Sequence, residues 1–189
     1  MLPYTAFLQQ TEKQMERNRI LIAYFSRKGN NYVNGEIVNL PVGNTEVIAR
    51  KLQGFAGGDL FAIETTAAYP EEYRETTEVA KVELRQNARP ELTGRVPDMD
   101  EYDVVFLGYP NWWGTMPMAV HTFLEQYDFS GKTVIPFCTH EGSGMGHSER
   151  DVQKLCPKAR VSAGLAIRGG HVNDADEELK KWLGKLNIR

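Results

Sequence analysis

Residues 26–45 combine hydroxyl groups, cations and a glycine at the expected start of a helix. The segment begins with Ser26-Arg27-Lys28 and ends with residues 43–45. At a helix amino terminus, free backbone N–H groups and the helix dipole both favour an anion, so this composition suits a phosphate. It matches neither a Walker loop nor a G-x-G-x-x-G turn. In the alternative interpretation, Asn44 or Thr45 only caps the helix.

Residues 109–117 place two adjacent tryptophans beside a glycine. Because Trp112 and Trp113 are neighbours at a strand end, both cannot point into one core. We therefore expect one of them to form a wall against which a flat ring can stack. Gly114 would let the backbone approach a ligand closely. In the alternative interpretation, the tryptophans plug the end of a sheet or form an interface.

Residues 139–146 contain three glycines and therefore many backbone N–H groups that are free to donate. Such donors suit the carbonyl and nitrogen acceptors of a heterocycle; the alternative is a mobile turn. His140-Glu141 with His147 does not match H-E-x-x-H, so we expect no metal. Ser143 lies outside a G-x-S-x-G motif, which argues against a serine hydrolase. We assign no catalytic residue.

The elements that position these loops alternate between strand and helix. The apolar segments 20–25, 60–63, 104–109 and 133–138 are continuous, as in strands covered on both faces, whereas 161–167 alternates as at a sheet edge. Pro136 lacks the N–H that a central strand uses, so we expect a bulge or frayed pairing there. Five strand-helix alternations predict an α/β fold with three layers, a doubly wound five-stranded parallel sheet between helices. Helices are expected over 45–52 (stopped by Gly54), 70–88, 117–127, 148–156 and from 173 or 174 onward.

The predicted domain organisation is an N-terminal extension, residues 1–18, followed by a single domain, residues 19–189. Within the domain, the sixteen residues 27–42 are long for a strand-helix connection. Tyr32, Ile37 and Val38 are too apolar for a solvated linker. We therefore interpret this loop as a flap over a ligand; the alternative is a surface decoration.

Composition excludes several classes of protein. A formal net charge of −3 over 189 residues does not indicate a nucleic-acid surface. No apolar run approaches the roughly 18 residues that span a membrane, and no signal peptide is visible at Met1. The cysteines Cys138 and Cys156 have no zinc-site spacing and are expected to be free thiols, which favours a cytoplasmic location.

The three loops occur in order at three strand ends, and together they resemble those of the flavodoxin-like FMN-binding family. The likeness covers about residues 19–170 and is greatest to flavodoxins with Tyr-Pro-x-Trp-Trp-Gly in the second loop and Pro-Phe-Cys-Thr in the fourth strand. It implies the strand order 2-1-3-4-5 and an FMN cofactor. The residues implied to hold the phosphate are Ser26, Arg27, Gly43, Asn44 and Thr45; those implied to contact the ring are Pro110, Asn111, Trp112, Trp113, Gly114 and Thr115 on one side and Thr139, His140, Gly142, Ser143 and Gly144 on the other.

The resemblance implies a flavoprotein that transfers electrons to or from a partner protein or a small molecule. An NAD(P)H-dependent FMN reductase of quinones or similar acceptors is the alternative, and a third possibility is a non-enzymatic fold that binds another protein. Whether the chain is an enzyme or a carrier, and its oligomeric state, stay open. A partly cationic His140 beside the flavin would favour two-electron chemistry.

Overall fold

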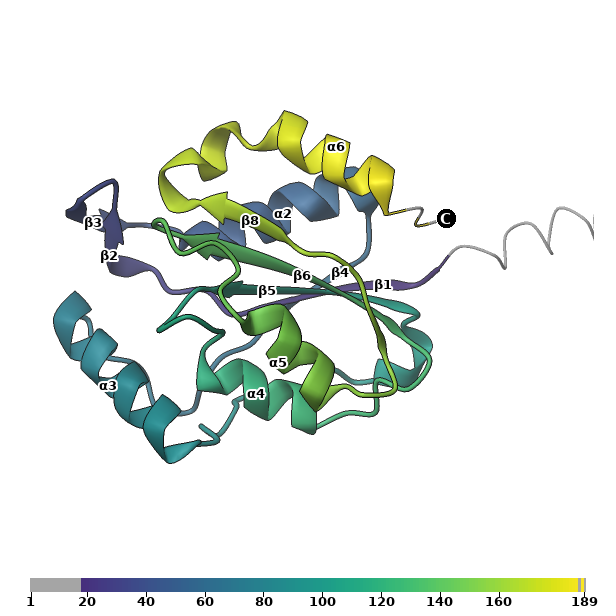
Figure 1. The fold of residues 1–189 in the computed structure, drawn as a ribbon, viewed down its shortest axis with the longest axis horizontal. Coiled ribbons are helices and arrows are strands. Elements are labelled where there is room, and N and C mark those ends of the chain that lie inside the picture. Colours follow the sequence, from purple (N-terminus) through teal and green to yellow (C-terminus); the bar gives the residue numbers. More distant parts are fainter. Residues whose placement is uncertain (1–17, 187, 189) are drawn as a thin grey trace, which may run out of the picture.

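A parallel β-sheet runs through the centre of the protein (Figure 1). The computed structural model describes residues 18–186 and 188, so the predicted extension lies outside the described residues except for Asn18. The order β4-β1-β5-β6, with β7 and β8 both pairing with β6, confirms the predicted 2-1-3-4-5 arrangement, its fifth strand being split in two. The strands are β1 (Ile20–Tyr24), β4 (Asp59–Ala62), β5 (Val104–Pro110), β6 (Thr133–His140), β7 (Arg160–Val161) and β8 (Leu165–Arg168).

Helices cover both faces of the sheet (Figure 1). Leu21 and Ala23 of β1 belong to one hydrophobic core, whereas Ile22 and Tyr24 belong to the other. Two buried faces explain why the strand is apolar at every position. The core of Ile22 and Tyr24 packs against α2 (Asn44–Ala56) and α6 (Asp176–Lys185), and the core of Leu21 and Ala23 packs against α4 (Met118–Glu125) and α5 (Ser148–Leu155). The remaining helices are α3 (Tyr73–Gln86) and the short 3-10 helices η1 (Met99–Glu101) and η2 (Gly169–Asp174).

Helix boundaries differ from the sequence prediction by one to four residues, and three of these differences have a clear local cause. Helix α2 continues through Gly54 and ends at Ala56, because Gly57 takes a positive φ of 73°, which a helix cannot continue and which glycine adopts readily. Helix α3 starts three residues after Pro70, because the Glu72 side chain caps it by accepting the Glu75 N–H at 2.8 Å. Helix α6 starts at Asp176, because residues 169–174 form η2.

Pro136 interrupts the sheet on one side only. The Thr139 carbonyl of β6 accepts the Asn111 N–H on the β5 side, whereas the Val134 carbonyl accepts the Ser162 N–H on the side of the edge strand. Because the backbone polar groups of successive strand residues point to opposite sides, those of the even-numbered residues of β6 face the edge strand. The pairing of β6 with β5 is continuous through Pro136, and the edge strand breaks between β7 and β8. Since proline has no N–H to donate toward that edge, the predicted fraying occurs there and not against β5.

The long loop of residues 27–42 folds as a β-hairpin. Strand β2 (Gly29–Val33) pairs antiparallel with β3 (Glu36–Leu40), and Asn34 and Gly35 form the turn with φ of 52° and 95°. Both values lie in the left-handed region that two-residue hairpin turns require. In Figure 1 the hairpin and α3 lie at the same end of the molecule, where β1, β5 and β6 finish.

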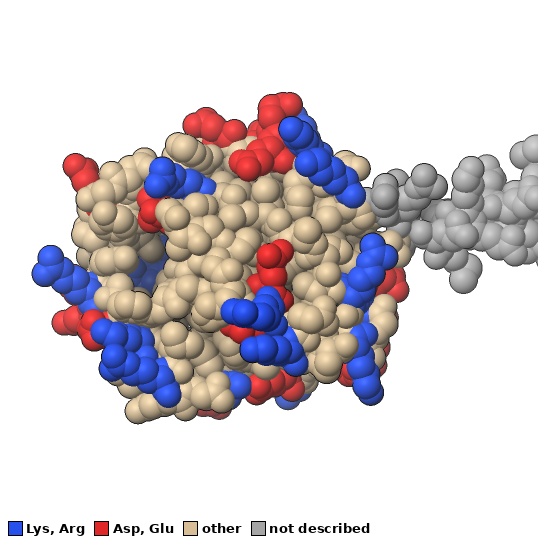
Figure 2. Space-filling view, in the orientation of Figure 1, with Lys and Arg blue, Asp and Glu red and all other residues tan. Residues whose placement is uncertain are grey.

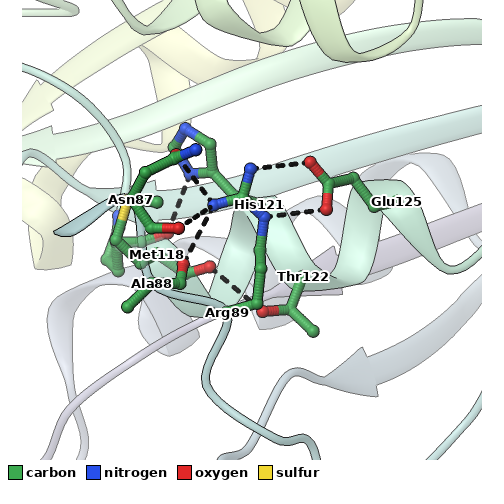
Figure 3. Close-up of polar contacts among 8 residues, drawn as sticks. Asn87, Ala88, Arg89, Met118, His121, Thr122 and Glu125 are labelled. Atoms are coloured by element: carbon green, nitrogen blue, oxygen red, sulfur yellow. Dashed lines mark hydrogen bonds and ion pairs between the residues drawn. The ribbon is translucent and has the colours of Figure 1, made fainter. Parts of the chain in front are cut away.

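A polar cluster around Arg89 ties the end of α3 to α4 (Figure 3). The Arg89 guanidinium donates to both carboxylate oxygens of Glu125, each at 2.7 Å, and to the backbone carbonyls of Asn87 and Ala88. The hydrogen bonds from Arg89 hold the pKa of Glu125 below its usual value. The buried imidazole of His121 lies beside this cluster on α4. We interpret the cluster as a structural anchor for α3, which borders the site described below.

Within residues 18–186 and at 188, no helix has both the length and the apolar character needed to cross a membrane.

Candidate functional site

The three loops singled out in the sequence meet at the carboxyl edge of the sheet. They follow β1, β5 and β6, which are adjacent strands. The Thr45 and Thr139 hydroxyls are 2.8 Å apart and join the first loop to the third. Asn111 joins the second loop to the third, because its Nδ2 donates to the Gly144 carbonyl at 2.8 Å. The loops therefore form one site.

The amino terminus of α2 forms the first part of this site. The Ser26 hydroxyl accepts the Glu46 N–H at 3.0 Å, which leaves the N–H groups of Asn44 and Thr45 without an acceptor inside the helix. A Cβ atom at Gly43 would overlap the Ser26 hydroxyl and lie 2.6 Å from the Arg27 carbonyl oxygen. Only glycine therefore lets the two ends of the hairpin come together at the helix terminus.

Arg27 anchors the hairpin instead of reaching over the helix terminus. Its guanidinium donates to the carbonyls of Pro70 and Glu71, each at 2.6 Å, and to the carbonyl of Asn30. Burial lowers the pKa of Arg27 from its ordinary value. Of the predicted phosphate residues, Ser26, Gly43, Asn44 and Thr45 lie together, whereas the hydrogen bonds of Arg27 hold its charge near the start of α3.

The two tryptophans point in different directions, as predicted. Trp112 is half-buried and packs edge-on against Phe25 and Tyr69, with ring centroids 5.3 and 5.2 Å away. Trp113 is 48% exposed and lies against α3, where its Nε1 donates to the Thr77 carbonyl at 2.9 Å. Its φ of 56° is unusual for a bulky residue and marks a backbone held in place by its surroundings.

In the third loop, the hydrogen bonds and surroundings of His140 define its protonation state. Burial, followed by the charge of Arg168, lowers the pKa of His140. The His140 Nδ1 accepts the Gly142 N–H at 2.9 Å, so it carries no proton and the neutral ring holds its proton on Nε2. The expected partly cationic imidazole is therefore disfavoured. Arg168, at the end of β8, supplies the positive charge on this side of the loop.

Glu141, which the sequence analysis considered only as part of a metal motif and did not include among the site residues, lies inside the site. One carboxylate oxygen accepts the Asn34 N–H at the hairpin tip at 2.9 Å, and the other, Oε1, is buried without a hydrogen-bond partner among the described residues. A Cβ on Gly169 would contact both Oε1 and, at 2.5 Å, the Asn44 Nδ2. This unpaired acceptor therefore lies close to the amino terminus of α2.

Hydrogen bonds to Asp151 of α5 hold the second loop in place. The buried Thr115 hydroxyl and the His147 Nδ1 each lie 2.7 Å from the Asp151 carboxylate. Burial opposes ionisation of Asp151, but these two hydrogen bonds hold its pKa below the usual value. The backbone N–H of His147 also donates to the Gly114 carbonyl at 2.8 Å. Residues 110–115 are thereby fixed to α5.

A pocket of about 400 Å³ adjoins the second loop, between the hairpin and α3. Tyr73 and Thr77 of α3 line it together with Asn111 and both tryptophans of the loop. The sequence analysis missed these α3 residues, because nothing in the sequence of α3 indicates that it packs against the carboxyl edge.

Taken together, the site offers donors for an anion at α2, an unpaired carboxylate oxygen for a hydroxyl, and a tryptophan-lined loop for a flat ring. No group of three or more metal-ligating side chains occurs in residues 18–186 or 188.

Several solved structures are similar to this chain. A candidate flavoprotein from Bacteroides eggerthii DSM 20697 is 29% identical over 92% of this chain and 100% of its own, with a TM-score of 0.75. One from Bacteroides uniformis ATCC 8492 is 26% identical over 89% and 99%, with a TM-score of 0.70. A Lactobacillus acidophilus NCFM flavoprotein, solved in complex with FMN, shares the fold at 21% identity over 88% and 99%, with a TM-score of 0.63.

No curated protein matches the sequence. The profile of the family described as Flavodoxin matches residues 19–186. That range includes the whole sheet and all three loops of the site. The chain therefore belongs to the flavodoxin family.

Proposed function

We propose that this protein binds FMN at the carboxyl edge of its sheet and works as an electron-transferring redox protein. The observation that carries the proposal is the convergence of three loops on the amino terminus of α2, joined by the Thr45–Thr139 and Asn111–Gly144 contacts. Membership of the flavodoxin family and the FMN complex of the Lactobacillus relative support the choice of cofactor.

The described residues fit each part of FMN. The phosphate needs donors, which the Asn44 and Thr45 amides, the Asn44 side chain and the Ser26 hydroxyl supply. The hydroxylated chain of FMN needs acceptors, and Glu141 Oε1 is an acceptor that receives no hydrogen bond from residues 18–186 or 188. The residues that would surround the ring are Pro110, Asn111, Trp112, Trp113, Gly114 and Thr115, with Thr139, His140, Gly142, Ser143 and Gly144.

The bound flavin would supply the electron chemistry, while the chain binds, orients and shields it. Asn111 fixes the distance between the second and third loops, and Asp151 with Thr115 fixes the second loop against α5. The neutral imidazole of His140 keeps its proton on Nε2 and adds no charge to the site. No side chain has to act as an acid or base.

An NAD(P)H-dependent reductase of small acceptors is the second candidate. The observation that favours it is the pocket of about 400 Å³ beside residues 111–113, which offers space for a second ring next to the proposed flavin. In either case the donor and acceptor, whether a partner protein or a small molecule, belong to the proposal.

A cytoplasmic location is part of the proposal. Cys138 and Cys156 are both buried and unpaired, and burial raises the pKa of each thiol to about 12. Free thiols of this kind are typical of reducing compartments.

Calorimetric titration of the protein with FMN and with riboflavin tests the cofactor assignment. We expect FMN to bind and riboflavin, which lacks the phosphate, to bind at least tenfold more weakly, because the α2 terminus contributes only to the phosphorylated ligand. Equal affinity for both, or no heat with FMN, would contradict the proposal.

Anaerobic stopped-flow mixing of the FMN-loaded protein with NADH and with NADPH separates the two candidates. Rapid bleaching of the flavin colour by either nucleotide would identify a reductase. Stable colour for minutes would favour a carrier that receives its electrons from a partner protein.

A further inference from the structure

The pocket of about 400 Å³ between the hairpin, α3 and the second loop has a composition that indicates its ligand. Its volume lies within the range of small-molecule sites. Figure 2 shows a hollow at the end of the molecule where the hairpin and α3 lie, with blue atoms at its bottom. Arg27 is the positively charged residue among those that line the pocket.

Aromatic rings form the walls of this pocket, and contacts with neighbouring groups hold them in place. Trp113 is fixed by its hydrogen bond to the Thr77 carbonyl and by the Lys81 ammonium 5.0 Å from its ring centroid. Tyr73 stacks on Tyr32 of the hairpin, with ring centroids 6.0 Å apart and planes 25° apart. Walls that are already ordered lose little entropy when a flat ring binds between them.

The charge in the pocket has no ion-pair partner among the described residues. Arg27 forms no ion pair with any residue in the described part of the chain, and its hydrogen bonds go to three uncharged carbonyls. Carbonyl oxygens satisfy the donors but do not cancel the charge. The carboxylates of Glu71 and Glu72 act on the Arg27 charge from a distance, but neither forms an ion pair with it, and Glu72 caps α3 by accepting the Glu75 N–H. A half-buried guanidinium in this state favours an anionic ligand.

We propose that this pocket binds a flat aromatic anion, an aromatic ring that carries a carboxylate or another anionic oxygen. The ring lies among Tyr73, Trp112 and Trp113, and its anionic group faces Arg27. The inference rests on the proposed function in one respect: the second loop lines both sites, which would make the ligand a neighbour of the flavin and a candidate for its redox partner or regulator.

The test is calorimetric titration with 2-naphthoate and with its uncharged amide, on the protein with and without FMN. We expect 2-naphthoate to bind at least tenfold more tightly than the amide in both forms. Arg27→Gln should abolish this preference, because the positive charge is the feature that distinguishes the two probes.

A pair of variants locates the binding site. Thr77→Phe places a ring into the pocket and should weaken 2-naphthoate binding at least tenfold, whereas Glu78→Phe adds the same ring at an exposed position of α3 and should leave binding unchanged. Helical circular dichroism and the FMN affinity of both variants, measured in parallel, show whether α3 and the cofactor site are intact.

Three results would overturn the inference. The first is equal binding of the two probes, and the second is unchanged 2-naphthoate binding by Thr77→Phe. The third is displacement of 2-naphthoate by FMN, which would make the pocket part of the flavin site itself. Because FMN binding is measured separately, a failure of the cofactor assignment would be recognised independently of these results.

Discussion

At the scale of single residues, Gly43 and Gly54 of the same helix illustrate opposite uses of glycine. A side chain at Gly43 would overlap Ser26 and the Arg27 carbonyl, whereas nothing lies within 4 Å of a Cβ at Gly54. We predict that Gly43→Ala lowers the free energy of unfolding by about 1–3 kcal/mol and weakens FMN binding. Gly54→Ala, the matched control, should raise that free energy by about 0.5–1 kcal/mol. Urea denaturation and FMN titration check both; equal effects would contradict the role of Gly43.

His140 gives a prediction about pH. Its pKa in the folded protein is lowered by burial and by Arg168, so the unfolded chain binds more protons between that pKa and the ordinary value of about 6.5. The contribution of neutral His140 to stability is therefore present above about pH 6.5 and is lost as the pH falls through this window.

The measurement is urea denaturation at about pH 7 and about pH 5.5 for the natural protein and His140→Gln. The natural protein should lose more stability on acidification than the variant does, and an equal loss would refute this role. In a nuclear magnetic resonance titration, Arg168→Gln should raise the pKa of His140, because a neighbouring positive charge is removed.

At the scale of the elements, the hairpin crosses the carboxyl edge and is held at both ends. Arg27 anchors its base, and Glu141 accepts the Asn34 N–H at its tip. We predict that Glu141→Ala speeds FMN dissociation about five- to tenfold, because one charge-assisted hydrogen bond and the unpaired acceptor are both lost. Stopped-flow displacement of FMN measures the rate, and faster hydrogen exchange at Asn34 would confirm that the tip has loosened. An unchanged rate would mean that the hairpin does not retain the cofactor.

The anchor of α3 gives a second prediction at this scale. Arg89→Gln removes the two-pronged contact with Glu125 and the bonds to the carbonyls at the end of α3, so it should cost about 1–2 kcal/mol of stability. The control is Lys180→Gln in the exposed pair with Glu177, which should change stability by less than about 0.5 kcal/mol. Thermal unfolding of both variants checks the difference.

The elements also show where sequence reasoning stops. The strands were predictable because two buried faces make β1, β5 and most of β6 apolar. The hairpin was interpreted only as a flap, although Asn34-Gly35 between two β-rich segments is a strong local signal for a hairpin turn. The contribution of Tyr73 and Thr77 to the site could not be predicted from the sequence, because the placement of α3 depends on tertiary packing.

At the scale of the whole molecule, the strand order and the meeting of the three loops follow from one rule. Parallel strands joined by helices finish at the same edge, so loops far apart in sequence become neighbours there. The hydrogen bond between the Thr45 and Thr139 hydroxyls joins two of these loops across 94 positions of the sequence. What the rule does not give is the direction of individual side chains, such as Arg27, which depends on the carbonyls near α3.

Ligand binding at this shared edge should stabilise the entire fold. With free FMN at about 100 times its dissociation constant, we predict about 2.7 kcal/mol of added stability and an unfolding midpoint roughly 5–10 °C higher. Differential scanning calorimetry with FMN, with riboflavin as the control, measures the shift. No shift at saturating FMN would mean that the ligand binds the unfolded chain equally well or does not bind.

The gap between β7 and β8 opposite Pro136 affects how the protein behaves in concentrated solution. An uninterrupted outer strand would offer an unpaired row of amide and carbonyl groups, on which the strand of another molecule could assemble. Here the row is broken at residues 162–164, and the Gly164 N–H is already bound to the Glu149 carboxylate at 2.7 Å. The proline that weakens one pairing thus makes this border of the sheet a poor template for aggregation.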